Sequence, residues 1–289
     1  MEHNPQTFYT SQGPTSDPGR HTDLFTGLPD DLPELVKAVQ GCMLHIFWAE
    51  RYGVTLAEER KATVAMRALS HKLESYRLID PRPLSVTRPM DTKLVGNCRD
   101  FSQLLASMLR HKGIPARPRC GFGTYFLPDH YEDHWVCEYW NADQKRWIMV
   151  DAQLDQLQQE VLKIDFDPLD VPHDRFIVGG KAWQLCRIEG VDPKKFGIFE
   201  FNGLAFVRGD LIRDILSLNL IEILPWDGGF GFLSKREDEM TNEDWCYEFF
   251  DHMAVLTQAG DAGFAELREI YENEPGLHVP GEWIMQVNM

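Results

Sequence analysis

Apolar side chains recur every three or four residues in three segments of the first half of the chain. Residues 32–52 and 56–76 show this spacing, which is typical of amphipathic helices. Residues 97–112 show it most regularly, with apolar positions at Phe101, Leu104, Leu105, Met108 and Leu109. Gly113, with Pro115 beyond it, predicts the end of this third helix. Three prolines between residues 79 and 88 predict an extended connection.

Alternation of apolar and polar residues replaces the helical period after Pro115. Residues 116–126, 133–140 and 146–151 have this character, and they predict three strands. The run from Asn141 to Asp143 is a turn signal between the last two of them. Residues 133–151 therefore predict an antiparallel hairpin.

The rest of the chain is mixed in pattern. Helices are predicted at 153–163, 180–190, 204–223, 243–260 and 262–273. Residues 226–232 form a glycine-rich loop, which suits a mobile lid or a tight turn. Residues 1–30 carry few large apolar groups, so they predict a flexible arm or one that orders only against the rest of the protein. The whole pattern predicts an α+β fold, with a core in residues 31–160 and a mostly helical region in 161–289 packing on it.

The formal net charge of −16 is the strongest compositional signal. Such an acidic surface repels phosphate backbones and anionic lipids, so nucleic acids and membranes are poor candidates as partners. No apolar run approaches the ~18 residues of a membrane span, and the polar N-terminal segment lacks the features of a secretory signal. We therefore expect a cytoplasmic protein. Its six cysteines are scattered without a CxxC pair, which indicates thiols rather than a disulfide framework.

Cys98 stands at the start of the most regular predicted helix, directly after the turn formers Gly96 and Asn97. The free N–H groups and the dipole at a helix N-terminus stabilise a thiolate. Cysteines in this position can have pKa values of roughly 3.5–7.5, which makes them nucleophilic. The alternative is a buried structural cysteine, because one of six cysteines can occupy a helix start by chance.

His134 and Asp151 are placed to act together with Cys98. His134 lies near the start of one predicted hairpin strand, and Asp151 closes the other, so both fall near the same end of the hairpin. A carboxylate at the end of an apolar strand is costly unless it is paired. Asp151 can then orient the imidazole while its second nitrogen faces Cys98. A structural histidine is the alternative for His134.

Three motifs in this order resemble the transglutaminase-like superfamily, whose core is related to papain. Gly96-Asn97-Cys98-Arg99-Asp100-Phe101, followed by Gly113-Ile114-Pro115-Ala116-Arg117, resembles its cysteine helix and the next strand. Asp133-His134-Trp135-Val136-Cys137-Glu138 resembles its histidine strand, and Lys145-Arg146-Trp147-Ile148-Met149-Val150-Asp151 resembles its aspartate strand. The match covers about residues 90 to 155.

The resemblance implies an α+β core in which the cysteine helix packs on an antiparallel sheet. It implies that Cys98 attacks an acyl carbon, that His134 moves the proton and that Asp151 orients the imidazole. The backbone N–H of Cys98 is one expected oxyanion donor, and Tyr76 or Trp48 is a candidate for the second. We expect hydrolysis of an amide or related C–N bond in a peptide or small molecule, without a cofactor. Acyl transfer to an amine and a catalytically silent binding scaffold are the alternatives.

Other residues are assigned to the substrate or set aside. We expect Asn97, His130, Trp135 and Arg117 at the substrate, although a surface ion pair is an equal alternative for Arg117. His130 and His134 are four residues apart, but in a strand that spacing separates them by about 13 Å, so we predict no metal site. Residues after Asp151 carry no motif, and we expect them to shape a substrate pocket or the interface of a homodimer.

Overall fold

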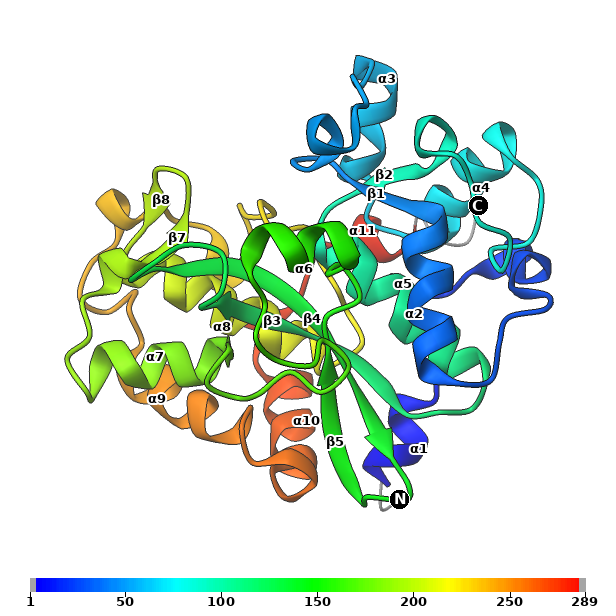
Figure 1. Ribbon diagram of the computed structural model, residues 1–289. Coiled ribbons are helices and arrows are strands. Elements are labelled where there is room, and N and C mark those ends of the chain that lie inside the picture. Colours follow the sequence, from blue (N-terminus) through cyan, green and yellow to red (C-terminus); the bar gives the residue numbers. More distant parts are fainter. Residues whose placement is uncertain (1–3, 286–289) are drawn as a thin grey trace.

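A six-stranded β-sheet lies at the centre of the computed structural model, which describes residues 4–285 (Figure 1). Its strands follow the order β6-β3-β4-β7-β8, and β5 pairs with β4 outside that path. The strands are β3 (Ala116–Gly123), β4 (Tyr131–Asn141), β5 (Arg146–Val150), β6 (Phe176–Val178), β7 (Phe196–Ile198) and β8 (Phe201–Asn202). The predicted hairpin is present as the antiparallel pair of β4 and β5. The protein thus has the mixed helix-and-sheet character that its sequence pattern predicts.

Strand β4 is paired unevenly along its two edges, and this positions the candidate site. One edge pairs with β3 from Glu132 to Tyr139. On the other edge, Tyr131 and Glu132 pair with β7, whereas residues 137–141 pair with β5. Residues 133–136 therefore have a strand partner on the β3 side only. Their backbone N–H groups on the open edge are available to a group that approaches from outside the sheet.

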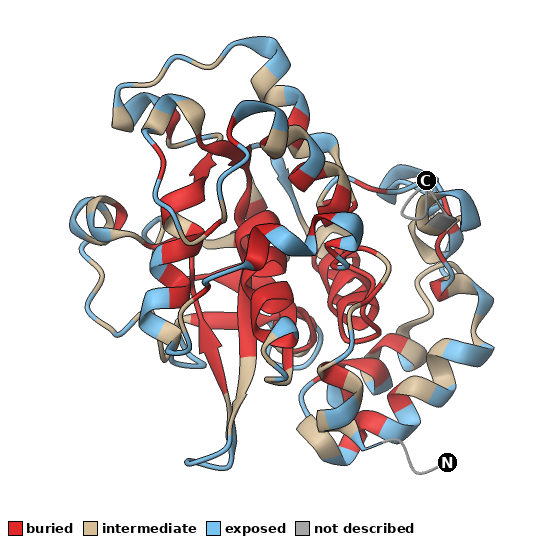
Figure 2. Ribbon diagram, turned by 90° about the vertical axis from the view of Figure 1, so that its right-hand side faces the viewer, coloured by how far each residue is buried: buried red, intermediate tan, exposed pale blue. Residues whose placement is uncertain are grey.

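Helix α5 (Cys98–His111) packs against β3 and β4 and is buried from Cys98 to Arg110 (Figure 2). Side chains alternate between the two faces of β4. Trp135 and Cys137 lie in clusters with residues of α5, whereas Val136 packs on the opposite face against Phe176. His134 shares that opposite face, with its ring 6.2 Å from the ring of Phe176.

The N-terminal helices cover α5 from outside the sheet. They are α2 (Leu32–Cys42), the short α3 (Glu58–Lys61) and α4 (Leu69–Ile79). The helix predicted for 32–52 ends ten residues early, because Met43–His45 forms a short strand, β1, parallel to β2 (Leu94–Gly96). This pairing places His45 opposite Gly96, two residues before Cys98. The helix predicted for 56–76 is likewise broken, and only its second half is α4.

Residues 4–30 lie against the rest of the protein. Helix α1 (Pro5–Tyr9) buries Tyr9, whose hydroxyl donates to the Leu218 carbonyl at 3.0 Å. Leu24 and Phe25 enter the same core as α2 and α5. Residues 4–30 are therefore packed on the rest of the protein through these apolar side chains.

The region after residue 160 contributes strands as well as helices. Strands β6, β7 and β8 extend the same sheet as β3, so residue 160 marks no break between separate folded units. The helices are α6 (Gln156–Leu162), α7 (Gly179–Arg187), α8 (Leu204–Ser217), α9 (Tyr247–Leu256), α10 (Phe264–Asn273) and α11 (Gly281–Met285). Helices α7 to α10 share a second apolar core with β3 and β7. Across residues 4–285, no helix combines the length and the apolar character that crossing a bilayer requires.

Candidate active site

Cys98 is the first residue of α5, and the preceding Asn97 caps the helix. The Asn97 side chain accepts from the Asp100 N–H at 3.3 Å, and the Asp100 carboxylate accepts from the Asn97 N–H at 3.0 Å. This reciprocal capping box fixes the entry of the chain into the helix. The cysteine is thereby held at a helix N-terminus, as the sequence predicts.

Buried charges anchor the first turn of α5 to the N-terminal helices. Asp100 forms ion pairs with Arg99 and with Lys72 of α4, each at 3.0 Å, and all three side chains are at most 1% exposed. Arg99 also donates to the Arg67 carbonyl at 2.6 Å. These contacts set the position of Cys98 relative to α4. Sequence reasoning missed Lys72, whose only signal is a lysine within an apolar helical pattern.

His134 and Asp151 form a hydrogen-bonded pair at the open edge of β4. The His134 Nε2 lies 2.8 Å from the Asp151 Oδ2, and both side chains are almost fully buried. Because a carboxylate only accepts, Nε2 donates this hydrogen bond, and in the neutral ring Nδ1 keeps its lone pair. The Tyr125 hydroxyl donates to the same Oδ2 at 2.7 Å, and the Gln153 N–H donates to Oδ1 at 3.1 Å. Three donors therefore compensate the burial of the Asp151 carboxylate.

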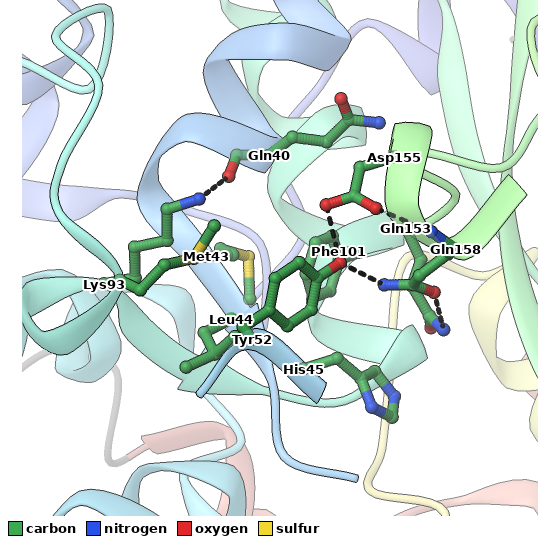
Figure 3. A pocket seen from close by; sticks show the side chains of 11 residues that line it. Gln40, Met43, Leu44, His45, Tyr52, Lys93, Phe101, Gln153, Asp155 and Gln158 are labelled. Atoms are coloured by element: carbon green, nitrogen blue, oxygen red, sulfur yellow. Dashed lines mark hydrogen bonds between the residues drawn. The ribbon is translucent and has the colours of Figure 1, made fainter. Parts of the chain in front are cut away.

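A chain of side-chain hydrogen bonds joins Gln153, two residues after Asp151, to Gln158, Tyr52 and Asp155 (Figure 3). The Gln153 side chain donates to Gln158 at 3.0 Å, and Gln158 donates to the Tyr52 hydroxyl at 3.3 Å. Tyr52 in turn donates to Asp155 at 2.6 Å. The small hollow between these groups has a volume of about 10 Å³, enough for one water molecule. This network orients the segment that follows Asp151.

Cys98 and His134 line one cavity with a volume of about 560 Å³. Asn97 and Gln153 line it as well, so the capped helix start and the segment after Asp151 meet there. No hydrogen bond joins the Cys98 thiol to the His134 ring within residues 4–285. Catalytic contacts of this kind commonly tighten only when substrate is bound.

The surroundings of Cys98 oppose the thiolate that a helix N-terminus alone would stabilise. Burial raises the pKa of the Cys98 thiol well above its usual value, and the Asp133 carboxylate raises it further. The backbone N–H groups of Trp135 and Arg99 act in the opposite direction but do not prevail. These surroundings favour the neutral thiol over the thiolate. Attack on a substrate then requires a base to remove this proton.

His45 is a functional candidate that sequence reasoning missed. It lines the same cavity as Cys98, and Figure 3 shows its ring at the edge of the adjoining hollow. Its Nδ1 accepts from the Phe47 N–H at 3.3 Å, which leaves the proton on Nε2. Burial, reinforced by His134, lowers the pKa of His45 to about 3, so the ring is neutral near pH 7.

Two buried carboxylates, Asp133 and Asp210, lie close together at the wall of the cavity. Asp133 lines it, and ligand atoms of Cys120, Asp133 and Asp210 all lie within 4.8 Å of one another. A divalent cation is held by donors of these types. However, Arg213 already donates to Asp210 at 3.3 Å and supplies positive charge there. Burial raises the pKa of Asp133 to about 6 and that of Asp210 well above its usual value.

The four residues expected at the substrate fall in different places. Asn97 lines the cavity, whereas the Trp135 side chain is buried beneath Cys98 with Cys120. His130 lies outside the lining, 3.2 Å from the Gly197 carbonyl and 3.1 Å from Glu132. Arg117, which we expected at the substrate, is instead buried away from the cavity in an ion pair with Glu138.

The two residues expected as the second oxyanion donor lie in different parts of the structure. Trp48 lines the cavity. Tyr76 is fully buried in the core formed by α2, α4 and α5, and it takes no part in the lining. Tyr76 is therefore a packing residue.

Replacement of Asp133 with asparagine should speed the alkylation of Cys98. Removing the neighbouring negative charge lowers the pKa of the thiol. Each unit by which the pKa falls increases the fraction of thiolate but also makes the thiolate less nucleophilic, and the net effect is a reaction about threefold faster. Because the pKa of Asp133 is about 6, the wild-type carboxylate is already protonated below that pH. The difference should thus be present near pH 8 and disappear near pH 5. Iodoacetamide labelling with peptide mapping measures it.

The exposed Asp129, paired with Lys195, provides the control. Asp129→Asn removes an equal charge from solvent and should leave the alkylation rate unchanged. Equal rates for wild type and Asp133→Asn at pH 8 would contradict the assigned role of Asp133.

Comparison with known proteins supports the resemblance stated above. Residues 51–152 match the family model of the transglutaminase-like superfamily. The match covers about a third of the chain and includes Cys98, His134 and Asp151. No curated protein and no solved structure matches this chain. A transglutaminase-like segment indicates chemistry of a cysteine-based hydrolase or acyltransferase.

Proposed function

We propose that this protein, whose residues 51–152 match the transglutaminase-like superfamily, is a thiol-dependent hydrolase of amide or related C–N bonds. The observation that carries the proposal is the His134–Asp151 hydrogen bond beside the cavity that Cys98 lines. Because Nε2 of His134 donates its proton to Asp151, the lone pair on Nδ1 is free to act as the base. The substrate is an amide of a peptide or a small molecule.

The proposed reaction begins with proton transfer from the Cys98 thiol to Nδ1 of His134. The sulfur forms a bond to the acyl carbon, and the carbonyl oxygen becomes an oxyanion. The C–N bond then breaks as His134 returns the proton to the leaving amine, which leaves a thioester on Cys98. Water attacks the thioester with His134 as base, and the carboxylic acid and the free thiol are released. Asp151 holds the imidazole through both proton transfers.

We assign two N–H groups to the oxyanion, and Trp48, which also lines the cavity, is the alternative to the second of them. One is the backbone N–H of Cys98 at the start of α5. The second is Nε2–H of His45, which is neutral and lines the cavity. Its position on β1, opposite Gly96, ties it to the segment that leads into Cys98.

His45→Ala should therefore reduce kcat by about 100-fold and leave KM nearly unchanged, since an oxyanion donor acts in the transition state. His45→Gln keeps a side-chain N–H and should recover part of the loss. Steady-state kinetics of both variants test this role. A change confined to KM would assign His45 to ground-state binding instead.

Acyl transfer to an amine is the second candidate. The carboxylates of Glu132 and Asp133 line the cavity and would attract a protonated amine. Hydrolysis remains the first proposal because water requires no binding site of its own. Competition between water and an added diamine for the acyl group measures the partition between the two products.

Detection of the acyl-enzyme tests the proposal directly. Wild-type protein is mixed with an activated anilide and quenched in acid, and its intact mass is recorded. We expect an added acyl group that maps to Cys98 and is removed by hydroxylamine, as for a thioester. Cys186→Ala, which removes a partly buried thiol of α7, is the control and should acylate normally. Anilide cleavage at full rate without an adduct on Cys98 would contradict the proposal.

A further inference from the structure

Every exposed Phe and Trp side chain among residues 4–284 lies at one place on the protein. These four side chains are Phe47, Phe199, Phe201 and Trp226, which are 56–66% exposed. All four line the cavity that also contains Cys98. Single exposed apolar residues are ordinary, whereas a cluster of large rings marks a surface that is used for binding.

These four exposed side chains, which we call the aromatic rim, come from three distant parts of the chain. Phe47 follows β1, Phe199 and Phe201 belong to the β7–β8 hairpin, and Trp226 lies in the loop after α8. Phe199 has φ of +52°, a conformation that a bulky side chain seldom adopts. Its ring nevertheless packs edge-to-face on Phe47 at a centroid distance of 5.2 Å. The hairpin thus holds an aromatic ring at a position where glycine or asparagine would be less strained.

The interior of the cavity continues this apolar character. Eleven of its nineteen lining residues are apolar or aromatic. The polar residues come from β1, the start of α5, β4 and the segment after Asp151, together with Arg213 of α8, and they include Cys98 and His134. A volume of about 560 Å³ is in the range of sites that enclose a small organic molecule. The cavity therefore offers a reactive polar end and a large apolar chamber.

The charges near the site select against an anionic acyl group. The lining holds two carboxylates, Glu132 and Asp133, against the single guanidinium of Arg213, and the whole chain carries a net charge of −16. Phosphate-bearing carriers and dicarboxylic acyl groups are repelled by this field. We propose that the apolar chamber binds a neutral aromatic or branched aliphatic acyl group of the amide substrate, an inference that rests on the proposed hydrolase function.

Hydrolysis of a series of N-acyl p-nitroanilides tests the acyl specificity. The acyl groups are acetyl, isovaleryl, phenylacetyl and succinyl. We expect kcat/KM for phenylacetyl to exceed that for acetyl by about tenfold to a hundredfold, as burial of one such group in an apolar site provides. Succinyl, which is anionic at neutral pH, should be the poorest of the four. Equal rates for phenylacetyl and acetyl would overturn the inference.

Variants of the rim locate the preference in this cavity. Phe201→Ala and Trp226→Ala remove exposed rings, so they should fold normally and reduce the ratio of phenylacetyl to acetyl rates several-fold or more. Ile188 is 72% exposed outside the cavity, and Ile188→Ala is the matched control whose ratio should not change. An unchanged ratio in both rim variants would overturn the assignment of the binding site.

A binding experiment separates this inference from the proposed reaction. Calorimetry with Cys98→Ala compares N-phenylacetyl and N-acetyl p-nitroaniline as ligands without turnover. Tighter binding of the phenylacetyl compound, together with no cleavage by wild-type protein, would support the apolar chamber and reject the hydrolase. Equal binding of the two compounds would overturn the chamber even if wild-type protein cleaved both.

Discussion

Replacement of Cys98 with alanine is expected to reduce amide hydrolysis by about 10⁴-fold or more. The proposed covalent path requires a sulfur at this position, and His134 has no other group to deprotonate in the cavity lining that can attack a carbonyl. Removal of a nucleophile or its base in comparable triads has an effect of this size or greater. Initial rates with the best p-nitroanilide, measured with wild type and Cys98→Ala at equal concentration, provide the test.

A double variant that combines Cys98→Ala with His134→Ala tests whether the two residues act together. If Cys98 and His134 act as one unit, the double variant should be no slower than the slower single variant. Independent contributions would instead multiply. Circular dichroism of each variant checks the fold, and Cys186→Ala serves as the thiol control. Retention of more than about a tenth of the activity by Cys98→Ala would exclude a thioester path.

The three proposed catalytic residues were identifiable from the sequence because each carries a local signal. Cys98 follows a capping residue and begins a regular amphipathic pattern, and α5 begins at that residue. His134 and Asp151 stand at the ends of two alternating segments, and the β4–β5 pairing brings their side chains to 2.8 Å. Short-range patterns of this kind survive folding because the tertiary structure reinforces them.

The surroundings of the triad were not predictable in the same way. His45 reaches the cavity only because β1 pairs with β2, and a three-residue apolar segment at the end of a helical pattern gives no strand signal. The aromatic rim joins residues that are more than 150 positions apart, such as Phe47 and Phe199. The raised pKa of Cys98 depends on burial and on Asp133, both of which are set by tertiary packing.

The fold shows the same division between local and distant information. Helix α5 and the central hairpin were predicted close to their observed bounds, whereas the helices predicted at 204–223 and 32–52 extend six and ten residues beyond the ends of α8 and α2. Strands β6, β7 and β8 were missed, because each has at most three residues and is defined by its partner rather than by its own period. Arg117 was misplaced for a related reason, since its sequence environment gives no indication that Glu138 faces it across the sheet.

Glu138→Gln is expected to lower the free energy of unfolding by about 3–5 kcal/mol at pH 7. Glu138 is 4% exposed and accepts from Arg117 at 2.6 Å and from Arg119 at 3.0 Å. Arg119 keeps Asp214 at 2.8 Å, but Arg117 would retain only aromatic contacts with Trp147 and Tyr9. A buried guanidinium without a carboxylate partner is strongly destabilising. Urea denaturation of wild type and variant measures the difference.

The pH dependence of the stability difference between wild type and Glu138→Gln distinguishes the loss of a charge from a packing defect. Although burial opposes it, Arg117 and Arg119 lower the pKa of Glu138 to about 2. A depressed carboxyl pKa stabilises the folded state above the unfolded value of about 4.3, and this contribution is lost as the pH falls from there toward 2. The deficit of Glu138→Gln should therefore be full at pH 7 and smaller near pH 3.

The exposed pair of Glu74 with Arg20 provides the matched control, and Glu74→Gln should change stability by less than about 1 kcal/mol. An effect of Glu138→Gln as small as this would contradict the contribution assigned to the buried ion pairs of Glu138 with Arg117 and Arg119. Because Arg117, Arg119 and Glu138 do not line the cavity, their loss should weaken activity only through unfolding, with normal kcat in the folded fraction.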